Sequence, residues 1–355
     1  MQNKYSKTWQ EKTLGDILEK GSSNLSANKL IDCDGEYPVY GASGLVKKIN
    51  FYQQENEYLA IIKDGAGVGR VYHYPKKTSI LGTMQYLYPK ESVNIRFAYY
   101  YLTSIDFYKY YQGAAIPHIY YKDYKNEKLV LPSIQEQERI VGILGKVFEN
   151  IEQAKKNAEQ NLQNAKNLFD SELENIFTGN IEDWEKLNVG EIIKLEYGKA
   201  LPYSDRCNNG ENPVYGANGI KDRTNKYLHD KPSIIVGRKG SVGELNYVES
   251  KFWALDVTYY VKFDENQYNL NFLYYLLKRL KLQTLARGVK PGLNRNEVYN
   301  LNVAIPKINT QQQIVEKLDK LQEQVKSLEA IYEQKIKDLE ELKQSILQKA
   351  FNGEL

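Results

Sequence analysis

Basic residues beside glycine turns are the side chains of this sequence best suited to chemistry, and that chemistry is binding. Two such turns occur, KDGAGVGR (63–70) and GRKGSVGE (237–244), and each follows an apolar run typical of a β-strand. Backbone amides in a glycine turn, together with neighbouring cations, suit phosphate groups. A tight hairpin with solvated cations is the alternative interpretation. The cations concerned are Lys63, Arg70, Arg238 and Lys239.

Two further pairs of segments carry cations and amides. YPVYGASG (37–44) and NPVYGANG (212–219) combine proline with glycine, which favours a fixed turn, and a basic stretch follows each. YQGAAIPHIYYKDY (111–124) and LARGVKPGLNRNEV (285–298) diverge around a shared glycine, and Arg and Asn suit bidentate contacts to guanine and adenine. Surface loops without a ligand are the alternative. The candidate nucleic-acid-contacting residues are Lys47, Lys48, His118, Tyr121, Lys122, Lys221, Arg223, Lys226, Arg287, Lys290, Asn294 and Arg295.

Catalytic and metal-binding patterns are poorly represented. The three histidines, His73, His118 and His229, are scattered without metal-ligand spacing. The segment NPVYG resembles the N-P-P-Y motif of adenine methyltransferases, but its second proline is missing and no cofactor-type glycine loop precedes it. We therefore expect no catalytic residue, no metal site and no cofactor bound by this chain.

The composition is that of an ordinary globular protein, with 355 residues, 42% hydrophobic and 26% charged. No apolar run approaches the roughly 18 residues of a membrane span, and the first residues lack a signal-peptide pattern. Cys33 and Cys207 predict reduced thiols, so the expected location is the cytoplasm. A net charge of only +3 does not exclude nucleic acid, because cations can gather on one face.

The positions of these segments follow a tandem duplication of the whole chain. Trp9 aligns with Trp184, Pro132 aligns with Pro306, and the PVYG segments align in the same order. So long a period indicates two copies of one domain rather than a solenoid. Each copy begins with about 130 residues of short β-type runs and glycine turns, followed after the proline by one long helix. The predicted boundaries are 1–132, 133–180, 181–306 and 307–355.

Both helices carry an apolar stripe with heptad spacing, which predicts that they pair as an antiparallel coiled coil. Asn161 and Lys335 interrupt the two stripes at the same step and could fix the register. The predicted fold class is α+β, with two globular domains in tandem repeat, two long helices between them and a pseudo-twofold axis. Packing of each helix on its own domain is the alternative. The predicted pairing residues are Ile140, Leu144, Val147, Ile151, Leu168, Ile314, Leu318, Leu321, Val325, Leu328, Leu339 and Leu342.

The ordered set of motifs resembles the specificity (S) subunits of type I restriction-modification systems over essentially the whole chain. The resemblance is carried by the tryptophans, the PVYG turns, the prolines before SIQEQERIVGIL and KINTQQQIVEKL, and most specifically by the ending LKQSILQKAFNGEL. It implies two target recognition domains, each reading half of a split double-stranded DNA site. It also implies that the helices set the spacer and dock two methyltransferase subunits, which bind AdoMet, while restriction subunits complete the complex.

Two alternatives remain beside this resemblance. One is a specificity subunit of another type of restriction system. The other is a coiled-coil scaffold with two protein- or sugar-binding domains, to which a composition with 30 tyrosines is also suited.

Overall fold

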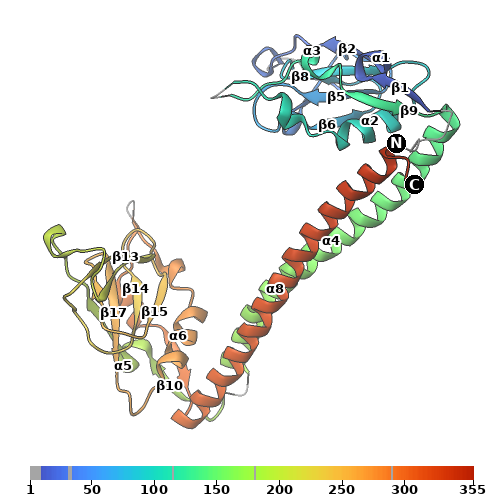
Figure 1. Cartoon of the computed structure of the whole chain (residues 1–355). Helices are drawn as coiled ribbons and strands as arrows, with labels where there is room; N and C mark the ends of the chain where they lie inside the picture. The colour runs from blue at the N-terminus through green and yellow to red at the C-terminus, as the bar shows by residue number, and fades with distance from the viewer. Residues whose placement is uncertain (1–8, 31–33, 114–115, 180, 289–290) are drawn as a thin grey trace. The chain divides into compact units, whose positions relative to one another are not determined.

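The computed structural model describes residues 9–30, 34–113, 116–179, 181–288 and 291–355, and the chain forms two compact units (Figure 1). Unit 1 comprises Met1–Ala158 with Gln334–Leu355, and unit 2 comprises Glu159–Glu333. Each unit therefore combines a globular domain with parts of both long helices. Among the described residues, no helix is long and apolar enough to cross a membrane.

The described residues of the globular domain of unit 1 form three small sheets and several short helices. Its central sheet is antiparallel, with the strand order β2-β8-β5-β6, and β5 is completely buried. The other sheets have the orders β1-β9 and β4-β3-β7. The strands are β1 (Gln10–Thr13), β2 (Leu18–Ser22), β3 (Tyr37–Gly41), β4 (Gly44–Ile49), β5 (Tyr58–Ile62), β6 (Val71–Tyr74), β7 (Ser79–Ile80), β8 (Met84–Pro89) and β9 (Lys128–Leu131). The helices are α1 (Leu14–Ile17), α2 (Ile95–Ser104) and α3 (Tyr121–Tyr124).

The globular domain of unit 2 repeats this topology, which confirms the tandem duplication. Its sheets have the orders β11-β17-β14-β15, β10-β18 and β13-β12-β16. The strands are β10 (Glu185–Asn188), β11 (Ile193–Tyr197), β12 (Asn212–Gly216), β13 (Gly219–Thr224), β14 (Ser233–Gly237), β15 (Leu245–Val248), β16 (Trp253–Ala254), β17 (Thr258–Phe263) and β18 (Asn302–Ile305). The helices are α5 (Val189–Ile192), α6 (Leu270–Arg279) and α7 (Arg295–Tyr299).

The PVYG segments form strands β3 and β12, and the turn after each depends on a later glycine. Gly44 and Gly219 have φ of +106° and +112°, a conformation that side-chain-bearing residues rarely adopt. Gly41 and Gly216 end the strands. A Cβ atom on Gly216 would lie 2.8 Å from the Lys221 side chain. The repeated glycines thus fix one hairpin in each copy.

The two long helices are α4 (Ile134–Thr178) and α8 (Ile308–Phe351), as the sequence predicted, and they run antiparallel. In unit 1, Lys155 pairs with Glu340 at 2.7 Å. In unit 2, Lys317 pairs with Glu172 at 2.6 Å. The first half of each helix therefore packs on the second half of the other. Of the predicted pairing positions, Ile140, Leu144, Ile151, Ile314, Leu318 and Val325 are buried, and Val147, Leu321, Leu328 and Leu339 are half-buried.

Two of the predicted pairing positions need correction. Leu168 and Leu342 are 45% and 46% exposed, whereas Phe169 and Leu347 are buried in the cores of their units. Near its C-terminal end each helix packs against a globular domain as well as against the other helix. The apolar face buried there is wider, and it follows the 3.6-residue period of a helix on a globular core rather than the 3.5-residue period of a coiled coil. The interrupting residues Asn161 and Lys335 are exposed and do not form a buried polar layer.

A buried glutamine fastens each long helix to the globular domain before it, a feature that the sequence analysis missed. Gln137 is fully buried, and its Nε2 donates to the carbonyls of Pro132 and Ser92 at 3.0 and 3.1 Å. Its Oε1 accepts from the backbone N–H of Asn94, the N-cap of α2, at 2.8 Å. Gln311 makes the same three contacts in unit 2, with Pro306, Gln267 and Asn269.

Candidate nucleic-acid interface

The glycine turns of the two units share one hydrogen-bonded framework. In unit 2, the N–H groups of Arg238 and Lys239 donate to the Val257 carbonyl at 2.9 and 3.1 Å, and the N–H of Leu293 donates to the Arg238 carbonyl at 2.9 Å. In unit 1, Lys63 and Asp64 donate to Thr83, and Ile119 donates to Lys63, at 3.0 to 3.2 Å. The framework joins the turn after the central strand to the divergent segment before α3 or α7.

The framework of unit 2 carries a cluster of two guanidinium groups on one tyrosine ring. The Cζ atoms of Arg238 and Arg295 lie 5.4 and 5.0 Å from the Tyr197 ring centroid. Tyr197 is 46% exposed, and its ring packs edge-on against Tyr259 at 5.0 Å. Burial and the hydrogen bond to Tyr197 raise the pKa of Tyr259 to about 12. Its hydroxyl donates to the Leu293 carbonyl at 3.0 Å, so the cluster is tied to the framework.

The equivalent positions in unit 1 carry different chemistry. The matching strands and helices place Ser22, Lys63 and Tyr121 where unit 2 has Tyr197, Arg238 and Arg295. Lys63 lies 3.9 Å from Asp64, and the Tyr121 hydroxyl donates inward to the Leu18 carbonyl at 2.7 Å. Exposed side chains of the neighbouring segments include Tyr108, Ile116 and Tyr120 together with the cations Arg70 and Lys122. The two units therefore present different side chains from one backbone framework.

Several of the predicted contact residues, all of them exposed except the half-buried Arg295, have a charged group without a hydrogen bond or ion pair to the described residues. Among the described residues, no hydrogen bond or ion pair is made by the side-chain nitrogens of Lys48, Arg70, Lys122, Lys221, Lys239, Arg287 and Arg295. Lys122 lies 5.2 Å from the Tyr120 ring, and His118 packs edge-on against the same ring at 5.0 Å. Lys290 lies outside the described residues. These side chains, above all the group on unit 2, are available to a ligand.

Other predicted contact residues are held by the protein itself. The Arg223 guanidinium donates to the carbonyls of Gly210 and Glu211 at 2.6 and 2.8 Å. Lys226 pairs with Asp205 at 2.9 Å, and Lys47 pairs with Asp34 at 3.0 Å. Asn294 uses its side-chain oxygen to cap α7. Their primary contribution is to loop structure, which sequence spacing alone does not distinguish from ligand contact.

Tyr197 and Tyr259, which support the candidate interface of unit 2, are residues that the sequence analysis missed. Tyr197 ends β11, and Tyr259 lies directly opposite it on β17. Both tyrosines occur in strand-type runs, where aromatic residues are ordinarily structural. An exposed aromatic at a strand end, next to a divergent GKALPY segment, is the one signal in the sequence that could have identified Tyr197.

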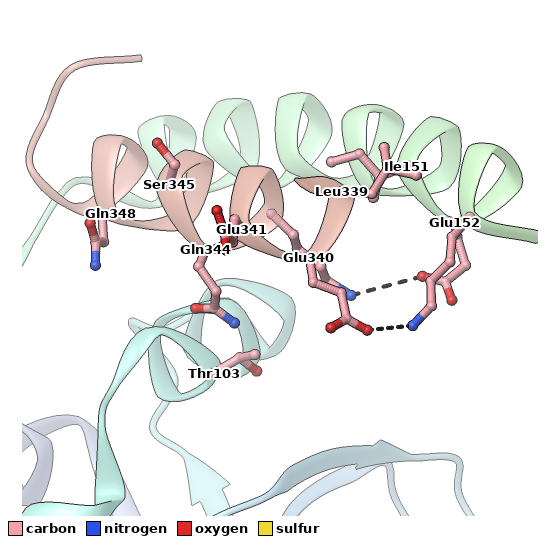
Figure 2. Close-up of a pocket in the computed structure, with 11 residues that line it drawn as sticks. Thr103, Ile151, Glu152, Leu339, Glu340, Glu341, Gln344, Ser345 and Gln348 are labelled. Atoms are coloured by element: carbon pink, nitrogen blue, oxygen red, sulfur yellow. Dashed lines mark hydrogen bonds and ion pairs between the residues drawn. The ribbon is translucent and has the colours of Figure 1, made fainter. Parts of the chain in front are cut away.

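A second open surface of unit 1 is a groove of about 670 Å³ between α2 and the paired helices (Figure 2). Thr103 and Gln344 face each other across it, and Leu339 lies beside Ile151 on its apolar wall. Interhelical ion pairs border the groove, with Lys155 and Glu340 at 2.7 Å and Lys343 and Glu152 at 4.0 Å. The described residues hold no group of three or more His, Cys, Asp or Glu side chains arranged to bind a metal. Most of the side chains that line the groove are polar or charged.

Comparison with known proteins identifies the family of the chain. The family model "Type I restriction modification DNA specificity domain" matches residues 6–160 and 181–338. The type I restriction enzyme EcoDI specificity subunit of Escherichia coli is 32% identical over 176 residues, which are 49% of this chain and 39% of that protein. The MjaVIII specificity subunit of Methanocaldococcus jannaschii is 24% identical over 95% of this chain and 90% of that protein.

Solved structures share the fold of the whole chain. A chain from a structure on complex assembly and conformational transition of the type I R-M system has a TM-score of 0.78 at 17% identity, with 99% of both chains covered. The HsdS subunit from Thermoanaerobacter tengcongensis has a TM-score of 0.60 at 16% identity, with 99% of this chain and 98% of that chain covered. Because the family model matches both copies of the repeat, the chain belongs to the specificity subunits of type I restriction-modification systems.

Proposed function

We propose that this chain is the DNA-reading subunit of a type I complex and recognises a bipartite, asymmetric site, with one globular domain for each half-site. The observation that carries the proposal is the framework shared by the two glycine turns, which presents Arg238 and Arg295 in unit 2 but Lys63 and Tyr121 in unit 1. A common backbone with different side chains is what two half-sites of different sequence require, since base edges are distinguished by side-chain donors and acceptors.

In this proposal the long helices set the spacer between the half-sites. Each is a single uninterrupted helix of 44 or 45 residues, which corresponds to roughly 65 Å at 1.5 Å per residue. Antiparallel pairing through buried apolar side chains makes such helices stiffer than one helix alone. The same helices, with the groove of unit 1, provide docking surface for two methyltransferase subunits, and restriction subunits complete the assembly.

Catalysis belongs to the partners in this proposal. The methyltransferase subunits bind AdoMet and methylate adenine, and this chain selects the site. The candidate contact residues are cations, amides and aromatics, the types that bind phosphates and base edges. This combination of residue types favours a role for the chain in recognising DNA sequence.

A coiled-coil scaffold with protein- or sugar-binding domains is the alternative from another class, and salt dependence separates the two. DNA binding that neutralises phosphates should weaken steeply as salt rises, because condensed counterions are released on binding. Binding to a protein or sugar should change much less. A specificity subunit of another restriction system would be distinguished by its partner subunits.

The test of the proposed function is the adenine methylation pattern of the host, measured by long-read sequencing with the gene present and deleted. Loss of one bipartite, asymmetric motif on deletion would support the proposal and give the target bases and the spacer together. A motif that proved to be one uninterrupted palindrome would contradict it. If deletion changes no motif, purified chain with the methyltransferase subunits should still methylate a bipartite site in vitro, and failure there would favour the scaffold.

A further inference from the structure

We infer that the half-site recognised by unit 2 contains an obligatory guanine and that Arg295 reads it, with Tyr197 holding the guanidinium in place. This inference rests on the proposed function and adds to it the base and the residue that reads it.

The Arg295 guanidinium lies over an aromatic ring while its hydrogen-bond donors make no bond to the described residues. Its Cζ lies 5.0 Å from the Tyr197 centroid, which fits cation–π contact, and the guanidinium makes no hydrogen bond or ion pair among the described residues. Stacking restricts the rotamers of a long side chain without using its N–H groups. A planar donor fork held in this way loses little entropy when it binds a planar pair of acceptors.

Arg238 shares the ring but is already bound to the protein. Its Nε and Nη2 donate to the Asp256 carbonyl at 3.2 and 2.7 Å. Its backbone N–H and carbonyl belong to the framework, with Val257 and Leu293 as partners. Arg238 therefore acts as a positioning residue, which fixes the ring and adds positive charge beside the free fork of Arg295.

Two other cations of the candidate interface in unit 2, Lys239 and Arg287, differ from Arg295 in a way that favours contact with phosphates. Lys239 and Arg287 are exposed, and neither lies over an aromatic ring of the described part of the chain. A mobile exposed cation neutralises a phosphate but does not hold the geometry that base discrimination requires. The stacked Arg295 is thus the residue of this group best arranged for a base edge.

Guanine is the base that fits a free, fixed guanidinium. Its O6 and N7 are two acceptors on one edge in the major groove, and bidentate contact from arginine is the commonest specific contact to DNA. Thymine offers one acceptor and a methyl group, and adenine pairs its acceptor with a donor, so neither matches a fork of donors. The Arg295 position of unit 1 is Tyr121, whose hydroxyl bonds inward, so the requirement belongs to one half-site.

The experiment uses the full chain with its methyltransferase subunits on a random DNA library, and the methylated molecules are sequenced. The wild-type complex should require G·C at a position of one half-site. The Arg295→Lys variant keeps the charge but loses the fork, and it should relax that requirement by about 10- to 100-fold while leaving the other half-site unchanged. Tyr197→Leu should relax the same position, and Arg287→Lys, the control, should leave base preference as in the wild type.

A chemical substitution in the DNA tests the contact itself. Replacing the required guanine by 7-deazaguanine removes the N7 acceptor, which should reduce methylation by the wild-type complex but add little to the defect of Arg295→Lys. Equal loss for all sequences in Arg295→Lys, with the motif unchanged, would make Arg295 a phosphate contact and overturn the inference. A bipartite motif without a guanine that depends on Arg295 would overturn it and leave the proposed function standing. A wild-type complex with no bipartite motif would overturn both.

Discussion

Arg279 at the end of α6 donates two hydrogen bonds to the carboxylate of Glu174 in α4, from Nε to Oε2 at 3.2 Å and from Nη2 to Oε1 at 3.0 Å. The guanidinium also lies 5.8 Å from the ring centroid of Phe177 in the same helix. The repeat places Ser104 and Gln348 at the two matching positions of unit 1. At these positions unit 2 therefore has an ion pair between its globular domain and the paired helices, whereas unit 1 has two neutral residues.

This ion pair predicts a pH-dependent contribution to stability. The hydrogen bond from Arg279 lowers the pKa of Glu174, so the contribution is present above the unfolded pKa of glutamate, about 4.3, and is lost as pH falls through the lower folded value. Arg279→Ala should cost about 0.5–1 kcal/mol at pH 7, since the pair is partly exposed. Denaturant unfolding of both proteins at pH 7 and pH 3 measures the difference, which should shrink at pH 3.

A matched control is Lys337→Ala, which removes an exposed pair with Glu341 at the i,i+4 spacing of α8. Its effect on stability should be too small to measure. A difference between wild type and Arg279→Ala that stays constant down to pH 3 would show that the packing of Arg279 on Phe177, rather than its charge, carries the effect.

Residues near the C-terminal end of α8 are predicted to stabilise the domain formed by the start of the chain. Leu347 is fully buried in the unit 1 core, and Phe351 packs edge-on against Phe97 of α2 at 5.4 Å. Leu347→Ala should cost about 2–5 kcal/mol because it leaves a cavity. Hydrogen exchange should show the loss of protection in α2, far from the mutation in sequence.

The control for this prediction lies in the same helix. Leu342→Ala removes the same side chain at a position that is 46% exposed and should cost well under half as much. Equal destabilisation by the two variants would mean that Leu342 does belong to a buried stripe, as the heptad spacing originally indicated.

The buried glutamines predict a third effect on stability. Gln137→Ala or Gln311→Ala would remove the hydrogen-bond partner of a buried carbonyl, that of Pro132 or Pro306, and of the half-buried N-cap N–H of α2 or α6. Each unsatisfied buried group costs about 1–3 kcal/mol, so we expect a loss of several kcal/mol. Gln135→Ala, two residues away on an exposed position, is the control for unfolding measurements. Similar midpoints for Gln137→Ala and Gln135→Ala would rule out the fastening role.

The sequence predicted the architecture more completely than the site, for a physical reason. Repetition, prolines and periodic apolar residues are local signals, so the long helices begin at Ile134 and Ile308, within two residues of the prolines. The predicted burial of Leu168 and Leu342 is wrong because heptad spacing assumes that the helix packs only against another helix along its whole length. Each helix also packs against a globular domain there.

The candidate site depends on contacts between segments that are distant in sequence. Tyr197 and Arg295 come together because β11 pairs with β17, and because Arg238 after β14 bonds through its backbone to Val257 and to Leu293 in the segment before α7. Arg223 donates to a backbone carbonyl, whereas the Arg295 guanidinium makes no such bond among the described residues. The spacing of residues in the sequence does not indicate which cation has a carbonyl within reach. Residue types could be predicted from the sequence, and their partners required the structure.

Salt dependence should separate phosphate contacts from base contacts on unit 2. Lys239→Ala should weaken binding to all DNA sequences by a similar factor and reduce the slope of log K against log salt by about one. Arg295→Lys keeps its charge and should leave the slope nearly unchanged. Titration of duplex DNA by fluorescence anisotropy at several salt concentrations measures both. An unaltered slope for Lys239→Ala would remove Lys239 from the interface.

Matched deletions in the long helices test the proposed spacer role. Residues 161–167 of α4 and 326–332 of α8 lie between the interhelical ion pairs at Lys155–Glu340 and Glu172–Lys317, so removing both sets keeps each ion pair and the apolar phase. Seven residues correspond to about 10 Å of helix, or about three base pairs. The complex should therefore methylate a motif whose halves are unchanged and whose spacer is about three base pairs shorter. Removing residues 161–167 alone breaks the pairing and should abolish activity. If the double deletion methylates the original motif with its original spacer, the helices do not set the distance between the half-sites.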